Sequence, residues 1–180
     1  MFAYRRIVRV SVVGTSGSGK TTFGRALAAR LDVPFVELDA INWQPGWTPM
    51  PEDEFRRRVA DVVTADRWVI DGNYAAVRDL VLARATTVAW LDYSRARIMT
   101  QVIRRSVSRV ITRRELWNGN REDPREWIDP EHPIRWAWST FGRRRREYTE
   151  RFASPDHAHL EVVRLSSRGD ARRWLRSVLD

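Results

Sequence analysis

The sequence has no cysteine and only one lysine among its 180 residues. Without cysteine the chain can form neither a disulfide framework nor a thiolate metal site. Its apolar runs are all much shorter than the roughly 20 residues that a membrane-spanning helix needs. The first residues lead directly into an apolar segment and lack the pattern of a signal peptide. We therefore expect a cytoplasmic protein that does not associate with membranes, as a monomer or homodimer.

Positive charge is abundant, with 32 Lys and Arg against 23 Asp and Glu, and the net charge is +9. Such an excess favours either a nucleic-acid partner or a site that neutralises nucleotide phosphates, with the remaining charge solvated. A GC-rich genome also raises the arginine content, so the net charge by itself does not identify nucleic acid as a partner. The hydrophobic fraction of 43% predicts a folded chain with one well-cored domain.

The single lysine, Lys20, lies in the segment GTSGSGKT at residues 14–21, which matches the phosphate-binding pattern G-x-x-x-x-G-K-[ST]. A compact ammonium fits inside a loop that surrounds phosphates, whereas a guanidinium is a wide planar fork. The β-branched residues 7–13 predict a buried parallel strand, and the apolar spacing of residues 20–31 predicts a helix. The loop therefore lies between a strand and a helix, as phosphate binding requires.

This motif assigns a set of residues to ATP and Mg²⁺. Backbone N–H groups of residues 17–21 would surround the β-phosphate at the positive end of the helix. Lys20 would bridge the β- and γ-phosphates, and the Thr21 hydroxyl would ligate Mg²⁺. The predicted nucleotide-binding residues are Gly14, Ser16, Gly17, Ser18, Gly19, Lys20, Thr21 and Thr22. The alternative is a glycine-rich turn that binds nothing.

Strand and helix patterns alternate along the rest of the chain. Further strands are predicted at 34–38, 68–71, 86–91 and 161–165, and further helices at 51–65, 75–84, 94–115, 134–151 and 170–179. This alternation predicts an α/β fold, a three-layer P-loop NTPase sandwich with a five-stranded parallel sheet. We expect residues 1–180 to form one domain with an acceptor-side insertion at about 40–65 and a lid at about 112–135.

Missing motifs narrow the class of P-loop protein. A guanine-reading N-K-x-D motif needs a second lysine, which the chain does not have. The sequence contains no L-S-G-G-Q transporter signature, and it is short for a helicase or an AAA-type motor. Among P-loop proteins, the class that remains is the small kinases.

Several segments resemble the adenylate-kinase-like group of P-loop kinases. Residues 68–72 (WVIDG) resemble its third strand, and Leu91-Asp92 with the following arginine-rich helix resembles its fourth strand and lid. The segments DGNY at 71–74 and RRELWNGNRE at 113–122 are similar to proteins of this group known as DNA topology modulation proteins. The resemblance covers nearly the whole chain and implies a P-loop kinase fold more firmly than any effect on DNA.

Two groups of charged residues suit phosphoryl transfer, which depends on positioning and charge neutralisation. Asp71 ends an apolar strand beside the phosphate-binding strand, where its carboxylate can support Mg²⁺; the alternative is a structural turn aspartate. Arg105, Arg109 and Arg113 are spaced so that they share one helix face, with Arg104 beside them. We expect one or two of these arginines to contact phosphate and the others to be solvated.

The acceptor side is less clearly defined. Asp39 follows the second strand, where it can orient and deprotonate an acceptor hydroxyl as a general base. Adenylate kinases continue Asp-Gly with an acceptor-binding arginine, whereas here Asn73 and Tyr74 follow, which favours a hydroxyl-bearing or nucleoside-like acceptor over an NMP. Trp43 and Trp47 either stack on the acceptor or pack a proline-rich loop.

Three further segments have local interpretations. Residues 118–120 (NGN) predict a turn at the lid tip, which could also sense the acceptor, because Asn and Gly tolerate positive φ. Residues 143–146 (RRRR) are interpreted as a solvated helix face, with nucleic acid as the alternative partner. Residues 166–168 follow the last strand, where this fold places adenine.

These observations predict a Mg²⁺-dependent kinase that transfers the γ-phosphoryl of ATP to a small molecule, nucleoside or nucleotide. The predicted catalytic residues are Lys20, Asp71, Arg105, Arg109 and Asp39, and the predicted metal-site residues are Thr21 and Asp71. The alternative function is a nucleotide-dependent regulator that binds nucleic acid through its arginine-rich helices and hydrolyses ATP slowly.

Overall fold

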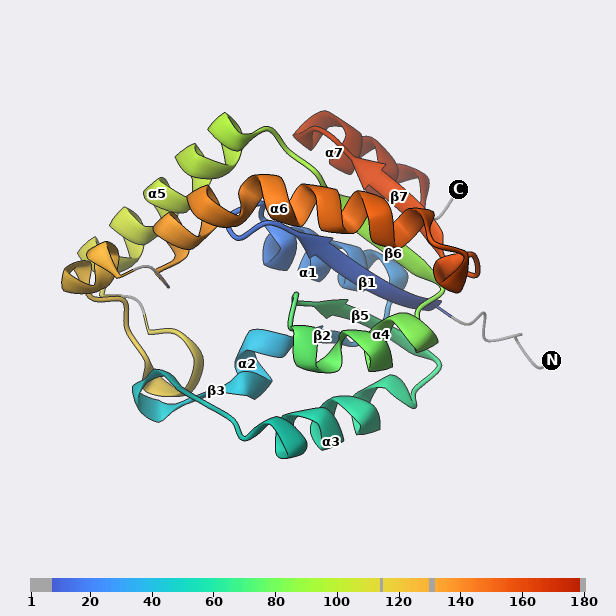
Figure 1. The fold of residues 1–180 in the computed structure, drawn as a ribbon, viewed down its shortest axis with the longest axis horizontal. Helices are drawn as coiled ribbons and strands as arrows, with labels where there is room; N and C mark the ends of the chain where they lie inside the picture. Colours follow the sequence, from blue (N-terminus) through green and yellow to red (C-terminus); the bar gives the residue numbers. More distant parts are fainter. Residues whose placement is uncertain (1–7, 114, 130–131, 179–180) are drawn as a thin grey trace.

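A five-stranded parallel sheet forms the centre of the molecule in the computed structural model, which describes residues 8–113, 115–129 and 132–178 (Figure 1). The strand order is β2-β5-β1-β6-β7. The strands are β1 (Val8–Gly14), β2 (Phe35–Glu37), β5 (Arg67–Asp71), β6 (Thr87–Leu91) and β7 (Glu161–Leu165). The predicted α/β fold with a five-stranded parallel sheet is confirmed.

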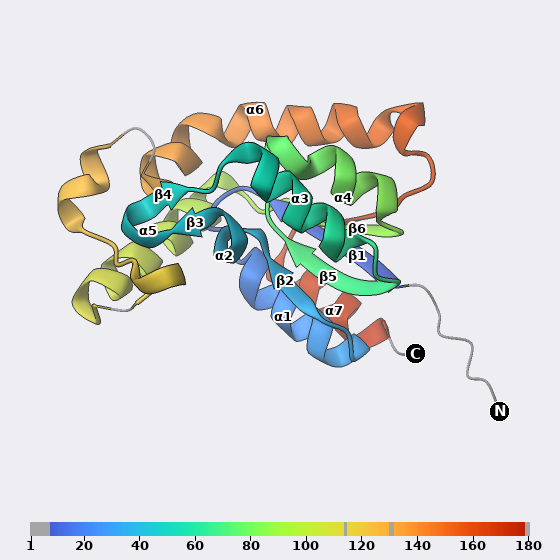
Figure 2. The ribbon, with the colours of Figure 1, turned by 90° about the horizontal axis from the view of Figure 1, so that it is seen from below.

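Helices cover both faces of this sheet. They are α1 (Lys20–Leu31), α2 (Leu38–Asn42), α3 (Glu52–Val63), α4 (Arg78–Arg84), α5 (Arg95–Ile111), α6 (Pro133–Ala153) and α7 (Arg168–Ser177). Figure 2 shows α1 and α7 on one face, and α3, α4 and α6 on the other. No helix within the described ranges is both long and apolar enough to cross a membrane.

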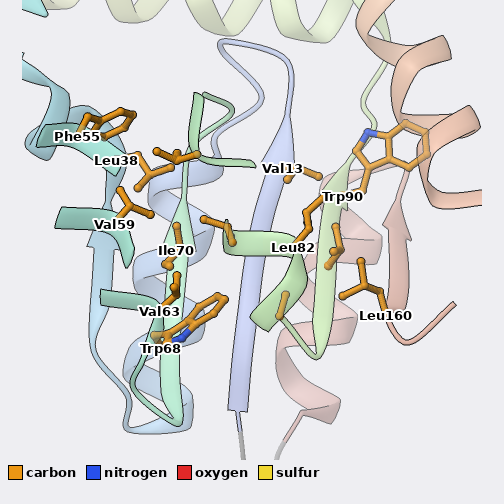
Figure 3. Close-up of a cluster of buried hydrophobic side chains, with 14 of the residues drawn as sticks. Val13, Leu38, Phe55, Val59, Val63, Trp68, Ile70, Leu82, Trp90 and Leu160 are labelled. Carbon is orange, nitrogen blue, oxygen red and sulfur yellow. The ribbon is translucent and has the colours of Figure 1, made fainter. Parts of the chain in front are cut away.

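Each face of the sheet has its own hydrophobic core. On one face, Phe55 and Val59 of α3 and Leu82 of α4 pack against Ile70 and Trp90 of the sheet (Figure 3). On the other face, a second cluster joins α1, α5 and α7, with members Phe23, Leu27, Ile98, Val102 and Ala171. Because both faces are covered, the strands can be almost entirely apolar, which is the pattern seen in the sequence.

The strand register brings the functional loops together at one edge. Val12 of β1 lies opposite Asp71 at the end of β5, and Asp71 in turn lies opposite Glu37 at the end of β2. In parallel sheets the carboxyl ends of the strands share an edge, where ligands bind at the switch in strand order. The segments that follow β1, β2 and β5 therefore meet at this edge.

Three segments differ from the sequence prediction. The strand predicted at 34–38 ends at Glu37, and the short helix α2, which was not predicted, follows it directly. The helix predicted at 94–115 ends at Ile111, and Arg113 follows it with a left-handed φ of 47°. The stretch 42–50, which lies in the predicted insertion at about 40–65, contains a small hairpin of β3 (Trp43–Gln44) and β4 (Thr48–Pro49) around the 3-10 turn η1 (Pro45–Trp47). Pairing of Gln44 with Thr48 across such a short turn leaves little sequence periodicity to detect.

Candidate functional site

The loop at residues 14–21 has the close backbone packing that a phosphate cradle needs. Gly14 and Gly17 have φ values of 150° and 84°. A Cβ at Gly14 would lie 2.7 Å from the carbonyl oxygen of Leu91, and a Cβ at Gly17 would lie 2.8 Å from Cβ of Val102. Only glycine fits at both positions, so the loop backbone is held against β6 and α5 while the N-terminus of α1 faces the site.

Lys20 is a half-buried positive charge at the start of α1. Its Nζ donates to the carbonyl oxygen of Thr15 at 3.3 Å. Burial lowers the pKa of Lys20, and the carboxylates of Asp71 and Asp39 oppose that shift. An ammonium removed from water in this way gains from further negative charge, which the phosphates of a nucleotide supply.

Thr21 and two carboxylates form an oxygen-rich corner next to Lys20. The Thr21 hydroxyl donates to Asp71 Oδ2 at 2.6 Å and lies 3.3 Å from Glu37 Oε1. Asp71 is buried, and its other oxygen, Oδ1, has no hydrogen-bond partner among the described residues. Burial raises the pKa of Asp71 to about 6, although Lys20 and the Thr21 hydrogen bond both lower it.

This corner fits a Mg²⁺ ion. Mg²⁺ prefers oxygen ligands and is usually bound by one or two carboxylates together with substrate phosphates. The unpartnered Asp71 Oδ1 is the oxygen that such an ion would satisfy. Glu37 is a third oxygen ligand candidate that the sequence reasoning missed. Its position at the end of β2 could have indicated it, because β2 is the strand next to β5.

Asp39 lies on α2, the short helix that directly follows β2. The Tyr74 hydroxyl donates to Asp39 Oδ1 at 2.6 Å. Burial and the Asp39 carboxylate raise the pKa of Tyr74, so the phenol remains a donor. Asn73 Nδ2 donates to the carbonyl oxygen of Gly14. The two neutral side chains predicted to face an acceptor therefore orient Asp39 and the phosphate-binding loop in this structure.

Arg105 is the arginine of α5 that faces the carboxylates of the site. Its Nε is buried and lacks a hydrogen-bond partner within the described part of the chain. Burial and the charge of Arg109 lower the pKa of Arg105 to about 10, while Glu122, Asp39 and Asp71 oppose that shift. At neutral pH Arg105 is a charged donor with an unused N–H group.

The other arginines that were predicted to line the lid do not all lie on the same side of α5 as Arg105. Arg109 forms an ion pair with Glu122, at 3.4 Å between Nη1 and Oε2. Arg104 is exposed, and Arg113 lies beyond the end of α5. The prediction that Arg105, Arg109 and Arg113 share one helix face is therefore wrong, because the helix stops two residues before Arg113.

The partner of Arg109 belongs to a buried network that the sequence reasoning did not find. His132 Nε2 lies 3.0 Å from Glu122 Oε1, and both side chains are almost fully buried. His132 Nδ1 accepts from the Ile134 N–H at the start of α6, which leaves the Nε2 proton to donate to Glu122. The network ties together α5, the lid and the start of α6, which follow one another along the chain.

The arginines at 143–146 are not a uniformly solvated face. Arg145 Nε donates to the buried carboxylate of Asp92 at 3.1 Å, and Arg164 binds the same carboxylate at 2.8 and 2.5 Å. Arg144 is half-buried, and its positive charge contributes to lowering the pKa of Lys20. The interpretation of this run as a solvated helix face therefore fits Arg143, Arg145 and Arg146, which are exposed, although Arg145 also pairs with Asp92, whereas Arg144 is half-buried.

The tryptophans of the acceptor-side segment pack against the lid. The Trp43 and Trp47 ring centroids are 5.7 Å apart, and Trp47 lies 6.3 Å from Trp117, both pairs in edge-on geometry. This arrangement agrees with the packing alternative for the two tryptophans. Asn118 and Gly119 have φ values of 54° and 80°, which confirms the predicted turn.

Comparisons with known proteins identify related kinases. A protein-family model described as shikimate kinase matches residues 16–45. The shikimate kinase of Symbiobacterium thermophilum is 39% identical over 111 residues, covering 50% of this chain and 64% of that protein. That of Nitrobacter winogradskyi is 29% identical over 154 residues, covering 66% of this chain and 72% of that protein. The Symbiobacterium match thus spans less than two thirds of that relative.

Solved structures show the same fold. Shikimate kinase from Acinetobacter baumannii in complex with shikimate has a TM-score of 0.60 at 19% identity, covering 97% of this chain and 92% of that one. Shikimate kinase from Aquifex aeolicus has a TM-score of 0.55 at 14% identity, covering 96% and 94%. The P-loop kinase fold is therefore confirmed. The likeness to DNA topology modulation proteins is corrected, since the relatives found are shikimate kinases.

Proposed function

We propose that this protein transfers the γ-phosphoryl group of ATP to a hydroxyl of a small molecule, with Mg²⁺ as cofactor. The observation that carries this proposal is that Lys20 lies within electrostatic reach of two carboxylates that have different hydrogen-bond partners. Asp71, bonded to Thr21, lies on the metal side, and Asp39, bonded to Tyr74, lies on the acceptor side. This arrangement separates the groups that hold a nucleotide from the group that can activate an acceptor.

Each residue has a distinct task in the transfer. The acceptor oxygen forms a bond to the γ-phosphorus as the bond from that phosphorus to the β,γ-bridging oxygen breaks, and the hydroxyl proton passes to Asp39. Lys20 and Arg105 stabilise the negative charge on the transferred group, and Thr21, Asp71 and Glu37 hold the metal side. Mg²⁺ supplies charge neutralisation at the phosphates when bound.

We further propose that the acceptor is a small hydroxylated acid, with shikimate as the first compound to test. The relatives named above support this choice. Positive charge on the acceptor side also supports it, because Arg144 and Arg78 are half-buried and form no ion pair within the described residues. Burial together with the charges of Arg151 and Arg144 lowers the pKa of Arg78, so a carboxylate beside it would relieve repulsion.

The test is transfer of label from γ-labelled ATP in the presence of Mg²⁺. Shikimate, other hydroxylated acids, neutral polyols, nucleosides and NMPs are offered in separate reactions, with the folded Lys20→Ala variant as control. We expect label on a hydroxylated acid and its loss in the variant. Label on NMPs alone would contradict the proposed acceptor class, and slow hydrolysis without any labelled acceptor would contradict the kinase function.

A further inference from the structure

Two segments that are far apart in sequence contact each other directly on the acceptor side. We call residues 43–50 the acceptor-side loop and residues 115–122 the lid turn. Asn120 of the lid turn is buried, and its amide bonds twice to the acceptor-side loop. Its Oδ1 accepts from the Trp47 N–H at 2.9 Å, and its Nδ2 donates to the Gln44 carbonyl oxygen at 2.9 Å. The Asn120 side chain thus satisfies both a donor and an acceptor of the hairpin backbone.

Further contacts strengthen this junction. Asn118 Nδ2 donates to the Trp43 carbonyl oxygen. In the opposite direction, Trp47 Nε1 donates to the Arg121 carbonyl oxygen at 3.2 Å. The half-buried rings of Trp47 and Trp117 also pack edge-on in the same region. Several directional bonds between neutral groups, together with aromatic packing, specify one relative placement of the two segments.

Each segment is continuous with a residue that the proposed reaction uses. The acceptor-side loop follows directly on α2, which contains Asp39, and the Met50 N–H to Asn42 carbonyl bond of 2.7 Å closes the loop on that helix. The lid turn follows α5, which contains Arg105, and Glu122 of the lid turn is paired with Arg109. The junction therefore links the acceptor base to the arginine that faces the transferred group.

We propose that Asn120, assisted by Asn118, is a positioning residue that joins the lid turn to the acceptor-side loop so that both move as one body. One arrangement of this body fixes the separation of Asp39 and Arg105. Because both segments move together, a ligand that orders one of them also orders the other, and acceptor and nucleotide strengthen each other's binding by the same factor. The catalytic consequence rests on the proposed function, whereas the joint motion does not.

Hydrogen exchange tests the joint motion without requiring turnover. Three variants remove the hydrogen bonds of the junction in steps. Asn120→Ala loses both side-chain hydrogen bonds, whereas Asn120→Asp keeps the oxygen that accepts from Trp47 and loses the donor to Gln44. Asn118→Gly loses one hydrogen bond at a position of positive φ that glycine tolerates. The matched control is Glu115→Gln. Glu115 is exposed, lies in the same turn and forms its ion pair with Arg121 within that turn.

We expect amide exchange to become faster in both segments together, by about tenfold in Asn120→Ala, which corresponds to one or two lost buried hydrogen bonds. The increase should be smaller in the other two variants, and exchange in β5 should not change. Glu115→Gln should behave as the wild type. Faster exchange in the lid turn with unchanged exchange in the acceptor-side loop would overturn the proposal, because the segments would then open separately.

Kinetics test the positioning role with the acceptor that takes label. We expect Asn120→Asp to raise the KM for acceptor and the KM for ATP by similar factors of about 10, with a smaller change in kcat. Unchanged KM values would overturn the positioning role while the proposed function stands. If the wild type labels no acceptor, the proposed function fails, and hydrogen exchange still decides the joint motion.

Discussion

The phosphate-binding loop is formed by residues that are close in sequence, whereas the junction between the lid turn and the acceptor-side loop joins segments more than seventy residues apart. Where the phosphate-binding loop meets the end of β5, the charged groups are incompletely paired, as Asp71 Oδ1 shows by having no hydrogen-bond partner among the described residues. In the junction, the buried Asn120 amide is neutral and bonded at both ends. The phosphate-binding loop therefore has charged groups that a ligand can still pair with. The junction instead holds two segments together with neutral hydrogen bonds, which can break and re-form.

The largest expected effect concerns Lys20 in the phosphate-binding loop, the region with incompletely paired charge. Lys20→Ala should lower phosphoryl transfer by about 10²–10³-fold or more, because a half-buried donor that stabilises transition-state charge is lost. The unfolding free energy should change by no more than about 1 kcal/mol, since the desolvated ammonium is itself costly. Label transfer and urea unfolding measure the two effects, with Arg104→Ala as an exposed control. A large loss of stability would place Lys20 among the structural residues instead.

The acceptor base should respond differently from the phenol that orients it. Asp39→Asn should lower kcat by about 10²–10³-fold, because the amide cannot take the acceptor proton. Tyr74→Phe keeps the carboxylate and removes one hydrogen bond, so a loss of only about tenfold is expected. Steady-state kinetics with the acceptor that takes label compares the kcat values of the two variants. Equal losses in the two variants would indicate that Asp39 serves only to hold Tyr74.

The buried carboxylate of Asp71 should make stability depend on pH in the absence of Mg²⁺. Its folded pKa of about 6 lies above the ordinary 3.8, so the folded protein binds more protons between pH 4 and 6. The contribution of Asp71 to stability is therefore full below pH 4 and is lost as the pH rises through 6, by about 3 kcal/mol in total. This contribution is measured as the difference in unfolding free energy between the wild type and Asp71→Asn across pH 4–8. A difference that does not vary with pH would contradict the raised pKa.

The smallest expected effects concern the buried Asp92, whose charge is fully paired, unlike that of Asp71. Arg164 makes two bonds to Asp92 and also lies over the Trp90 ring at 4.7 Å, whereas Arg145 makes one bond. Both arginines are partly exposed, so Arg164→Ala should cost about 1–2 kcal/mol of unfolding free energy and Arg145→Ala less than about 1. Thermal or urea unfolding checks the order. A larger cost for Arg145→Ala would show that α6 depends on this pair more than β7 does.

Local patterns were sufficient for much of the fold and for half of the candidate site. The β-branched runs, the helical spacings and the loop around Lys20 all lie within short windows, and the structure places these elements within a few residues of prediction. Asp71 was found because it ends an apolar strand beside the phosphate-binding strand. Arg113 was misplaced because a helix terminus depends on a few residues of local geometry that the apolar spacing does not encode.

The remaining features were decided only when the chain folded. The bond of Asn120 to Gln44 and Trp47, the pairing of Glu122 with His132 and the approach of Glu37 to Thr21 all join segments whose separation in sequence carries no periodic signal. Such contacts depend on strand order, on where loops close and on which side of the sheet a helix crosses. The sequence by itself thus determined the sheet and the phosphate-binding loop through local sterics and hydrophobic periodicity. The tertiary structure decided that Asp71 pairs with Thr21, that Asp39 pairs with Tyr74 and that Asn120 holds the lid turn, because burial and pairing of polar groups exist only in the packed molecule.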